Sequence, residues 1–265
     1  MVKSSVKEIL SLPTDTPDHM LYSPKKYKGL GLIKANWEAF IQQLNSIQIL
    51  RRSKNQYTIN EDKFKRIETV CIKKLHVELI DADVINTHKI RSYLREQEFK
   101  SWQSLKQKGK GVELFREYTP GNKIIIKKEG FSESEWKECI KMIANVVPVR
   151  VLHGRSQDNN RCRHACGEIE TLAHVLGFCP FGELLRNTRH HTIRSIIANA
   201  FREKYKTWNV HEEVHCISNE GSTRRVDILA INDNTNSGLI IDPTIRFEVD
   251  IDQPNQVNNE KKKYL

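Results

Sequence analysis

The residues with the clearest chemical meaning are three cysteines and a histidine in one short stretch, CRHACGEIETLAHVLGFC. Their spacing is Cys-x3-Cys-x7-His-x4-Cys. Three thiolates and one imidazole form the closed, tetrahedral ligand set of a structural zinc site. The spacing therefore predicts that Zn²⁺ is bound by Cys162, Cys166, His174 and Cys179.

Two alternatives to this ligand set remain at the level of sequence. His164 lies between the first two cysteines and is a spare ligand for His174. The intervals also differ from those of the commonest zinc finger, so a chance cluster of buried thiols is a competing interpretation. We favour His174, because ETLAHVL has the pattern of a short helix that would carry its imidazole towards the cysteines, and His-x4-Cys is typical of zinc knuckles.

A pair of aspartates forms the second candidate site. RRVDILAI and LIIDPTIRFEV, which run over 224–231 and 239–249, are rich in β-branched residues, and NDNTNSG between them favours a loop of about six residues. We therefore expect a β-hairpin. If its centre lies between positions 234 and 235, paired residues have numbers that sum to 469, which puts Asp227 opposite Asp242.

Facing aspartates would need a cation. Residues directly opposite in a hairpin have Cβ atoms about 5 Å apart, and two like charges at that distance are destabilising. Mg²⁺ favours carboxylate and water oxygens, so Asp227 and Asp242 are predicted to bind it. A slip of one residue would separate them onto opposite faces of the hairpin. Two surface aspartates near strand ends are the alternative interpretation.

A basic helix is predicted between these two sites, roughly from Leu184 to Tyr205. The predicted apolar stripe consists of Ile193, Ile196, Ile197, Ala200 and Phe201. Its first half is basic, although the helix dipole favours acidic side chains there. We interpret this as a phosphate-binding face, with a merely solvated basic face as the alternative. The candidate nucleic-acid contacts are Arg186, Arg189, His190 and Arg194.

The composition agrees with a nucleic-acid partner. The 265 residues carry a formal charge of +10 and an isoelectric point of about 9.3, which favours a polyanion. No apolar run is long enough to span a membrane, and the N-terminus lacks the apolar core of a signal peptide. The Gly-x4-Gly-Lys pattern is absent, so KQKGKGVELF is not expected to be a phosphate cradle. No small-molecule substrate is expected. Cys71, Cys139 and Cys216 are scattered, which fits a reducing, intracellular compartment.

The first 150 residues are predicted to be mainly helical. SLPTDTPDHMLYSPKKYKGLGLI is turn-rich and predicts an extended lead-in, and KQKGKGVELF predicts a loop. In FSESEW, Ser132 and Glu135 form a capping box, and the helix that follows is expected to end at Pro148. That helix should bury Trp136, Cys139, Ile140 and Ile143. Three earlier stripes have helical period: Trp37, Phe40, Ile41, Leu44 and Ile47; Phe64, Ile67, Cys71 and Leu75; and Ile90, Tyr93 and Leu94.

Taken in order, these motifs resemble the C-terminal end of polyproteins from early-branching, site-specific retrotransposons that lack long terminal repeats. Such polyproteins carry a reverse transcriptase, a zinc knuckle and a restriction-like endonuclease. CRHACGEIETLAHVLGFC resembles the knuckle, and RNTRHHTI resembles the Arg-His segment after it. RRVDILAI and LIIDPTIRFE resemble the two catalytic strands, and VNNEKKKY the lysine-bearing segment. LPTDTPDHMLYSP with GLGL, SWQSLKQKGKGVELF and the stretch to VRVLHGR resemble the linker that follows the polymerase thumb.

The resemblance implies an α+β protein of three parts. These are a mostly helical linker region over 1–150, a CCHC zinc knuckle over 151–183, and an α/β nuclease core of the PD-(D/E)xK type with a central hairpin over 184–265. It implies nicking of target DNA to prime reverse transcription, in the nucleus, with DNA and the element's RNA as partners. Asp227 and Asp242 correspond to the metal-binding carboxylates. Lys261 corresponds to the catalytic lysine, with Lys262 and Lys263 as close rivals.

The chain departs from the family pattern in three ways. Val226 stands where a proline usually precedes the first aspartate. The polymerase's paired aspartates are absent, so reverse transcription by this chain is not expected. The sequence stops at Leu265, soon after the lysines, which predicts an incomplete nuclease core and weak nicking. A nucleic-acid-binding module without catalysis and an inert remnant of a decayed element are the two alternatives.

Overall fold

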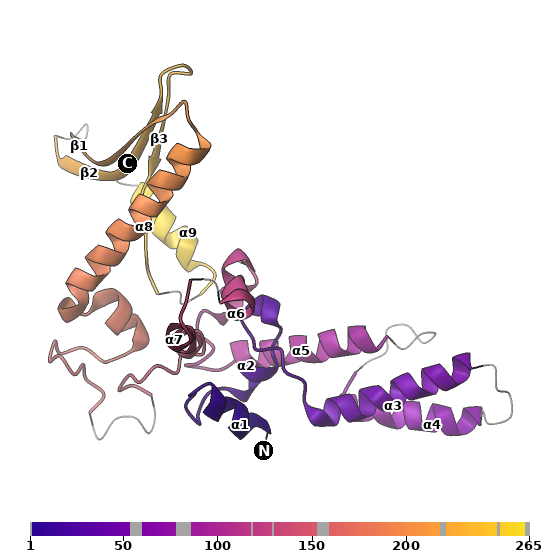
Figure 1. Ribbon diagram of the computed structural model, residues 1–265. Helices are drawn as coiled ribbons and strands as arrows, with labels where there is room; N and C mark the ends of the chain where they lie inside the picture. Colours follow the sequence, from indigo (N-terminus) through magenta and orange to yellow (C-terminus); the bar gives the residue numbers. More distant parts are fainter. Residues whose placement is uncertain are drawn as a thin grey trace. The chain divides into compact units, whose positions relative to one another are not determined.

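The computed structural model describes residues 2–53, 60–77, 86–117, 119–128, 130–152, 159–217, 221–247 and 250–262. The chain divides into two compact units, described separately below. Unit 1 comprises residues 1–147 and 248–265, and unit 2 comprises residues 148–247. The described part is mostly helical with one antiparallel sheet, so the α+β class is confirmed (Figure 1). The three-part division into linker, knuckle and nuclease core stays a prediction.

All secondary-structure elements in the described residues of unit 1 are helices, joined by turns and loops (Figure 1). Its elements are α1 Val2–Ile9, α2 Asp18–Tyr22, η1 Lys25–Tyr27, α3 Ala35–Arg52, α4 Glu61–Leu75, α5 Thr87–Gln103, η2 Val112–Phe115, η3 Thr119–Lys123, α6 Ile124–Lys127, α7 Glu133–Ile143 and α9 Gln253–Lys262.

One core of unit 1 lies among α3, α4 and α5, where the three predicted apolar stripes meet. α3 and α4 lie side by side (Figure 1). The prediction fails at Tyr93, which is exposed. Successive helical residues lie about 100° apart, so Tyr93 turns away from the core that its neighbour Leu94 enters. The buried residues of this core are Ile41, Leu44, Cys71, Leu75, Ile90 and Leu94.

The prediction of an extended lead-in over residues 11–33 is wrong, because this segment contributes to the second core of unit 1. That segment contains α2, whose Met20, Leu21 and Tyr22 are buried. Pro17 directly precedes the helix and Asp18 occupies its first turn, where the helix dipole favours an acid. The aromatic rings of Phe99 and Trp102, at the end of α5, lie against each other in the same core.

The capping box that begins α7 is confirmed. Glu135 donates its backbone N–H to the hydroxyl of Ser132, and the Glu135 carboxylate accepts the backbone N–H of Ser132. Trp136 and Ile140 are buried, as expected. The helix ends at Ile143 rather than at Pro148, because Asn145 adopts a left-handed conformation with φ of 53°. Cys139 and Ile143 are only partly buried.

Unit 2 combines a small cysteine-rich segment, one long helix and a three-stranded antiparallel sheet. Its elements are η4 His174–Phe178, η5 Pro180–Gly182, α8 Glu183–Lys204, β1 Asn209–Ile217, β2 Thr223–Asn232 and β3 Ser237–Ile241. The strand order is β1-β2-β3, and α8 packs mainly against β1 and β2 (Figure 1). The predicted hairpin corresponds to β2 and β3, whereas β1 was not predicted.

The register of this hairpin is confirmed. Ile228 pairs with Ile241, and Ala230 pairs with Leu239, so paired numbers sum to 469 as expected. The second strand is shorter than predicted, since β3 ends at Ile241. Pro243 has no N–H to donate to a neighbouring strand, which explains why the pairing stops there. The turn is also tighter, spanning residues 233–236.

The predicted apolar stripe of α8 is wrong in part. Ile196 and Ala200 are exposed, while Arg194 and Ala198 are buried. Residues four apart share one face of a helix, so Arg194 and Ala198 define the buried face. Ion pairs of Arg194 with acidic residues of β1 fix that orientation.

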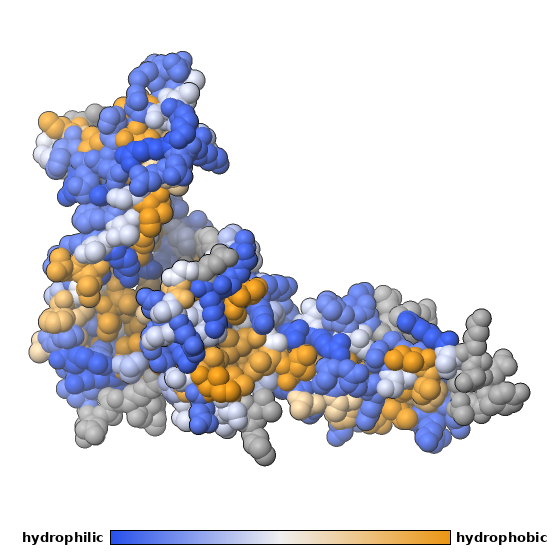
Figure 2. All heavy atoms as spheres, viewed as in Figure 1, coloured by the Kyte–Doolittle hydropathy of each residue, from blue (hydrophilic) through white to orange (hydrophobic). Residues whose placement is uncertain are grey.

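None of the helices in the described ranges is long and apolar enough to cross a membrane. Hydrophilic side chains cover much of the face seen in Figure 2, with apolar patches between them.

Candidate functional site

The first two cysteines lie at the ends of a tight turn. The backbone N–H of Cys162 donates to the carbonyl of Glu168, and the backbone N–H of Ala165 donates back to the carbonyl of Cys162. Ala165 and Gly167 both have positive φ, 54° and 89°, and so reverse the chain within a few residues. Cys162 and Cys166 are thereby brought to one side of the turn.

The other two predicted ligands are positioned by η4, a single π-helical turn. His174 begins the turn, and its backbone N–H donates to the hydroxyl of Thr171. Cys179 follows the turn, and its backbone N–H donates to the carbonyl of His174 at 2.8 Å. This hydrogen bond between residues i+5 and i, which is the π-helical pattern, fixes the positions of His174 and Cys179 relative to each other.

The structure brings all four predicted ligands together. Their ligand atoms lie within 4.8 Å of one another. Cys162 Sγ lies 3.7 Å from Cys179 Sγ, and Cys166 Sγ lies 3.3 Å from His174 Nε2. Tetrahedral zinc with bonds of about 2.3 Å to sulfur requires sulfur atoms about 3.8 Å apart, so the cluster can hold Zn²⁺.

The alternative ligand, His164, is outside this cluster. Its ring stacks on Phe181, with centroids 3.8 Å apart. The backbone N–H of His164 serves the site differently, because its hydrogen bond to the Cys162 sulfur lowers the pKa of that thiol. With His174 and the other two cysteines also contributing, the pKa falls to about 7. A thiolate is the form that ligates zinc.

A buried carboxylate that the sequence reasoning missed supports the cysteine turn. The side chain of Glu170 is 0% exposed and forms an ion pair with Arg163. It also accepts the backbone N–H groups of Arg150 and Arg163. The Arg163 guanidinium, together with these N–H donors, lowers the pKa of Glu170 to about 2. The sequence did contain a signal for this contact. Glu170 is an acidic residue between the two pairs of predicted zinc ligands, and Arg163 directly follows Cys162.

The hairpin brings the two predicted aspartates together. The register places Asp227 of β2 opposite Asp242, which directly follows β3. The Asp227 side chain is 17% exposed, and Asp242 is exposed. Burial, followed by the hydrogen bond with Asp242, raises the pKa of Asp227, against the opposing effect of His190. His190 Nε2 lies 3.2 Å from Asp227 Oδ1.

A third carboxylate lies in the same register on the neighbouring strand. Pairing of β1 with β2 is regular on either side of Glu213, which falls opposite Asp227. Glu213 itself has a φ of 56°. It is bound by Arg194, Arg225 and His191, and the two guanidiniums, Arg225 first, lower its pKa to about 2. Its charge is thus already compensated by side chains.

The four predicted nucleic-acid contacts on α8 all make contacts inside unit 2. Arg186 donates to the carbonyl of Cys179, and Arg189 donates to the carbonyl of Leu176. Both therefore hold the cysteine-rich segment against the helix. The Nε of Arg189 is buried without a hydrogen-bond partner among the described residues.

The environment of Arg194 differs from that of an exposed arginine that could contact a phosphate. Its side chain is 10% exposed and ion-paired with both Glu212 and Glu213 of β1. His190 faces Asp227. Nucleic-acid binding by these four residues stays a prediction, alongside the structural roles that their contacts give them.

The predicted catalytic lysine is only partly described. Lys261 lies in α9, an element of unit 1, whereas both aspartates belong to unit 2. Its side chain, like that of Lys262, lies outside the described residues, as does Lys263 as a whole. The role of Lys261 therefore stays a prediction.

Comparison with known proteins supports the resemblance seen in the motifs. No family model matches the chain. The "Retrovirus-related Pol polyprotein from type-1 retrotransposable element R2" of Popillia japonica is 24% identical over 258 residues, which cover 94% of this chain and 49% of that protein. The similarly named protein of Nasonia vitripennis is 27% identical over 250 residues, or 87% of this chain and 21% of that protein.

A third relative extends the range of organisms. The "Retrovirus-related Pol polyprotein from type-2 retrotransposable element R2DM" of Drosophila melanogaster is 21% identical over 238 residues, covering 88% of this chain and 22% of that protein. The chain spans about half the length of the Popillia protein and about a fifth of the other two. Over most of its length, therefore, this chain is a distant homologue of the Pol polyproteins of R2 retrotransposable elements.

Proposed function

We propose that this chain is the linker, zinc-knuckle and nuclease portion of an R2-like retrotransposon polyprotein, and that it nicks DNA using Mg²⁺ held by Asp227 and Asp242. The linker would occupy 1–150, the knuckle 151–183 and the nuclease core 184–265. The nucleus would be its site of action, with DNA and the element's RNA as partners. Distant similarity over most of the chain supports this proposal.

The contact between Asp227 and Asp242 is the observation that carries the nuclease assignment. Two carboxylates that share a site repel each other when both are ionised, and the pKa of Asp227 is raised first by burial and then by its hydrogen bond and charge interaction with Asp242. A divalent cation between them relieves it. Bound Mg²⁺ would polarise a phosphoryl oxygen and activate water for attack on phosphorus.

The protein's own side chains orient this pair. The imidazole of His190 holds the Asp227 carboxylate from the side of α8. A hydrogen-bonded carboxylate keeps its orientation when it ligates a metal, so His190 would act as a positioning residue. Lys261, assigned by resemblance alone, would stabilise negative charge that develops on the phosphate.

The zinc knuckle would serve this arrangement structurally. Zn²⁺ bound by its three cysteines and His174 would fix the fold of the cysteine-rich segment. Arg186 and Arg189 connect carbonyls of that segment to the first half of α8. His190 follows directly in that half, so the knuckle would determine where α8 presents its imidazole to Asp227.

A plasmid-nicking assay with Mg²⁺ tests the nuclease proposal. We expect wild-type protein to convert supercoiled plasmid to the nicked form and Asp242→Ala to lose this activity. Asp233→Ala is the matched control, because Asp233 is an exposed aspartate in the turn of the same hairpin. Nicking by Asp242→Ala at the wild-type rate would refute the assignment. If the wild-type protein binds DNA but does not nick it, the chain is a nucleic-acid-binding module without nuclease activity.

A further inference from the structure

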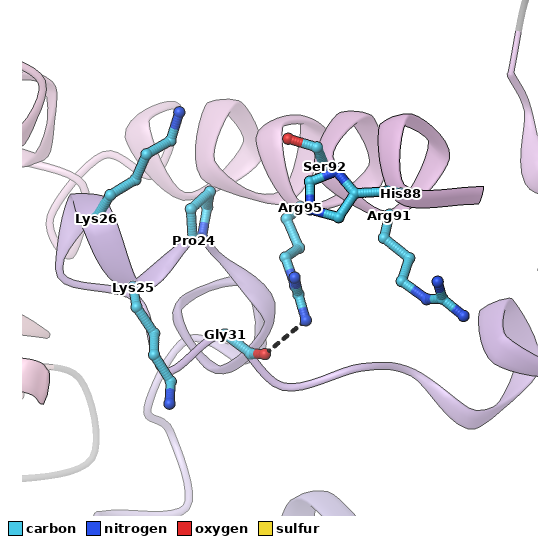
Figure 3. A pocket seen from close by; sticks show the side chains of 8 residues that line it. All are labelled: Pro24, Lys25, Lys26, Gly31, His88, Arg91, Ser92 and Arg95. Atoms are coloured by element: carbon cyan, nitrogen blue, oxygen red, sulfur yellow. Dashed lines mark hydrogen bonds between the residues drawn. The ribbon is translucent and has the colours of Figure 1, made fainter. Parts of the chain in front are cut away.

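A second cationic site lies in unit 1, in residues that neither the knuckle nor the hairpin includes. A pocket of about 390 Å³ opens between the segment around η1 and the helix α5 (Figure 3). It is lined by Pro24, Lys25, Lys26, Gly31, His88, Arg91, Ser92 and Arg95. None of these eight lining residues is acidic.

The GLGL stretch builds one wall of this pocket. The backbone N–H of Gly31 donates to the carbonyl of Ser23, and Leu30 and Leu32 donate to carbonyls of α2. Gly31 has a φ of 67°, and a Cβ there would lie 2.8 Å from Cγ of Lys25. The absence of a side chain at Gly31 thus lets the Lys25 stem pack closely against it.

The opposite wall supplies two guanidiniums from α5. Arg95 extends from the helix towards Gly31, whereas Arg91 extends away from Gly31 and pairs with Glu38 of α3 (Figure 3). Arg95 donates to the carbonyl of Gly31 at 3.0 Å. Its Nε is buried and has no hydrogen-bond partner in the described part of the chain. A buried donor without an acceptor costs free energy, which a bound anion would recover.

The distribution of ion pairs in unit 1 leaves this pocket electropositive. Arg91 is paired with Glu38 at 2.6 Å, and elsewhere in the unit cations such as Lys7 and Lys34 also have carboxylate partners. Among the described residues, Lys25 and Lys26 have none, although Lys26 lies over the Tyr27 ring. Lys25, Lys26 and His88 are exposed at the rim, where an arriving anion would meet them.

We propose that this pocket binds a phosphate group of a nucleic-acid backbone. Cationic side chains and an unused N–H donor match phosphate oxygens. Pro24 is the one apolar side chain among the lining residues, and His88 at the exposed rim is the one aromatic ring, so no second ring is available to enclose a base from its other face. That favours a backbone phosphate over a free nucleotide. The inference goes beyond the proposed nuclease, because it concerns other residues and requires no cleavage.

The test is the salt dependence of binding to a fluorescently labelled DNA duplex. Neutralised phosphates release counterions, so each lost contact lowers the slope of log affinity against log salt by about one unit. We expect the double variant Lys25→Gln with Lys26→Gln to flatten the slope by about one unit, which corresponds to the loss of one phosphate contact. The matched control, Lys65→Gln with Lys73→Gln, removes two exposed lysines of α4 and should leave the wild-type slope.

A second variant tests the same pocket in case the double lysine variant does not fold. Ser92→Glu adds a negative charge at the exposed rim and should weaken DNA binding, whereas Ser4→Glu on exposed α1 should not. Melting curves establish that each variant is folded.

Two outcomes would overturn the proposal. One is an equal slope for wild type, pocket variant and control, together with unchanged affinity in Ser92→Glu. The other is binding of inorganic phosphate or a nucleoside monophosphate, measured by calorimetry, that depends on Lys25 and Lys26 while DNA binding does not. The pocket would then bind a free phosphate compound instead of nucleic acid.

Discussion

His190 of α8 lies 3.2 Å from Asp227 of β2, so a helix side chain reaches one of the two aspartates that face each other across the hairpin. The same helix is bound at its first half to the cysteine-rich segment by Arg186 and Arg189. The two candidate sites of unit 2 are therefore mechanically connected through about one turn of α8.

Replacement of His190 by alanine should reduce Mg²⁺-dependent nicking about tenfold, because a carboxylate that loses its orienting hydrogen bond binds metal less well. Initial nicking rates at several Mg²⁺ concentrations measure the effect, and higher Mg²⁺ should restore part of the rate. His215→Ala, which removes an exposed histidine of β1, serves as the control. Equal nicking rates for His190→Ala and His215→Ala would show that His190 does not orient the Asp227 carboxylate.

Purified protein should contain about one zinc ion per chain, and Cys166→Ser should lose it together with part of the cooperative melting of unit 2. Zinc ligation contributes to folding, so removal of one thiolate ligand lowers both the zinc content and the stability of unit 2. Metal analysis and a melting curve measure the two effects. Cys216→Ser, an exposed thiol outside the cluster, should keep its zinc. A full zinc content in Cys166→Ser would refute the ligand assignment.

Arg194→Gln should destabilise unit 2 by about 2 kcal/mol, because it leaves Glu212 and Glu213 without their shared, largely buried partner. The estimate is below that for a fully buried pair, since both glutamates keep some solvent contact and a second arginine each. The salt dependence of DNA binding should match that of Arg66→Gln, an exposed control on α4. A flatter slope with an unchanged melting temperature would instead identify Arg194 as a phosphate contact.

Glu170→Gln should destabilise the cysteine-rich segment by at most about 3 kcal/mol at neutral pH, from a pKa near 2 in the folded state against an ordinary value of 4.5. The folded-state pKa is depressed, so this stability is present above about pH 4.5 and is lost as the pH falls towards 2. The melting-temperature difference from wild type should stay constant between about pH 5.5 and 7.5. Glu168→Gln, which alters an exposed side chain, is the control. A difference that disappears by pH 5.5 would contradict a depressed pKa.

The sequence predicted best where the signal is local. The capping box at Ser132, the hairpin register and the spacing of Cys162 to Cys179 each depend on residues close together in the chain. The strand β1 was missed because its alternation is interrupted by the pair Glu212 and Glu213. No apolar periodicity marks a strand whose central residues are paired with arginines.

The contacts that orient the candidate sites could not be read from the sequence. The sequence predicted Arg194 as a nucleic-acid contact, and only the packing of α8 on β1 shows that it also has glutamate partners. Glu170 could not be identified from a local pattern, since its backbone donors come from Arg150, which precedes the cysteine turn, and from Arg163 within that turn. Such contacts depend on which face of an element packs inwards, which is a property of tertiary structure.

The π-helical turn over His174–Phe178 has a consequence for how this segment can change. Such a turn holds one residue more than an α-helical turn. Deletion of Gly177 would restore an α-helical turn and rotate Cys179 by about 100° around the helix axis, away from Cys162. A side chain added at Gly177 would meet nothing within 4 Å. The segment can therefore vary in residue type at this position, while its length is as fixed as the identity of the ligands themselves.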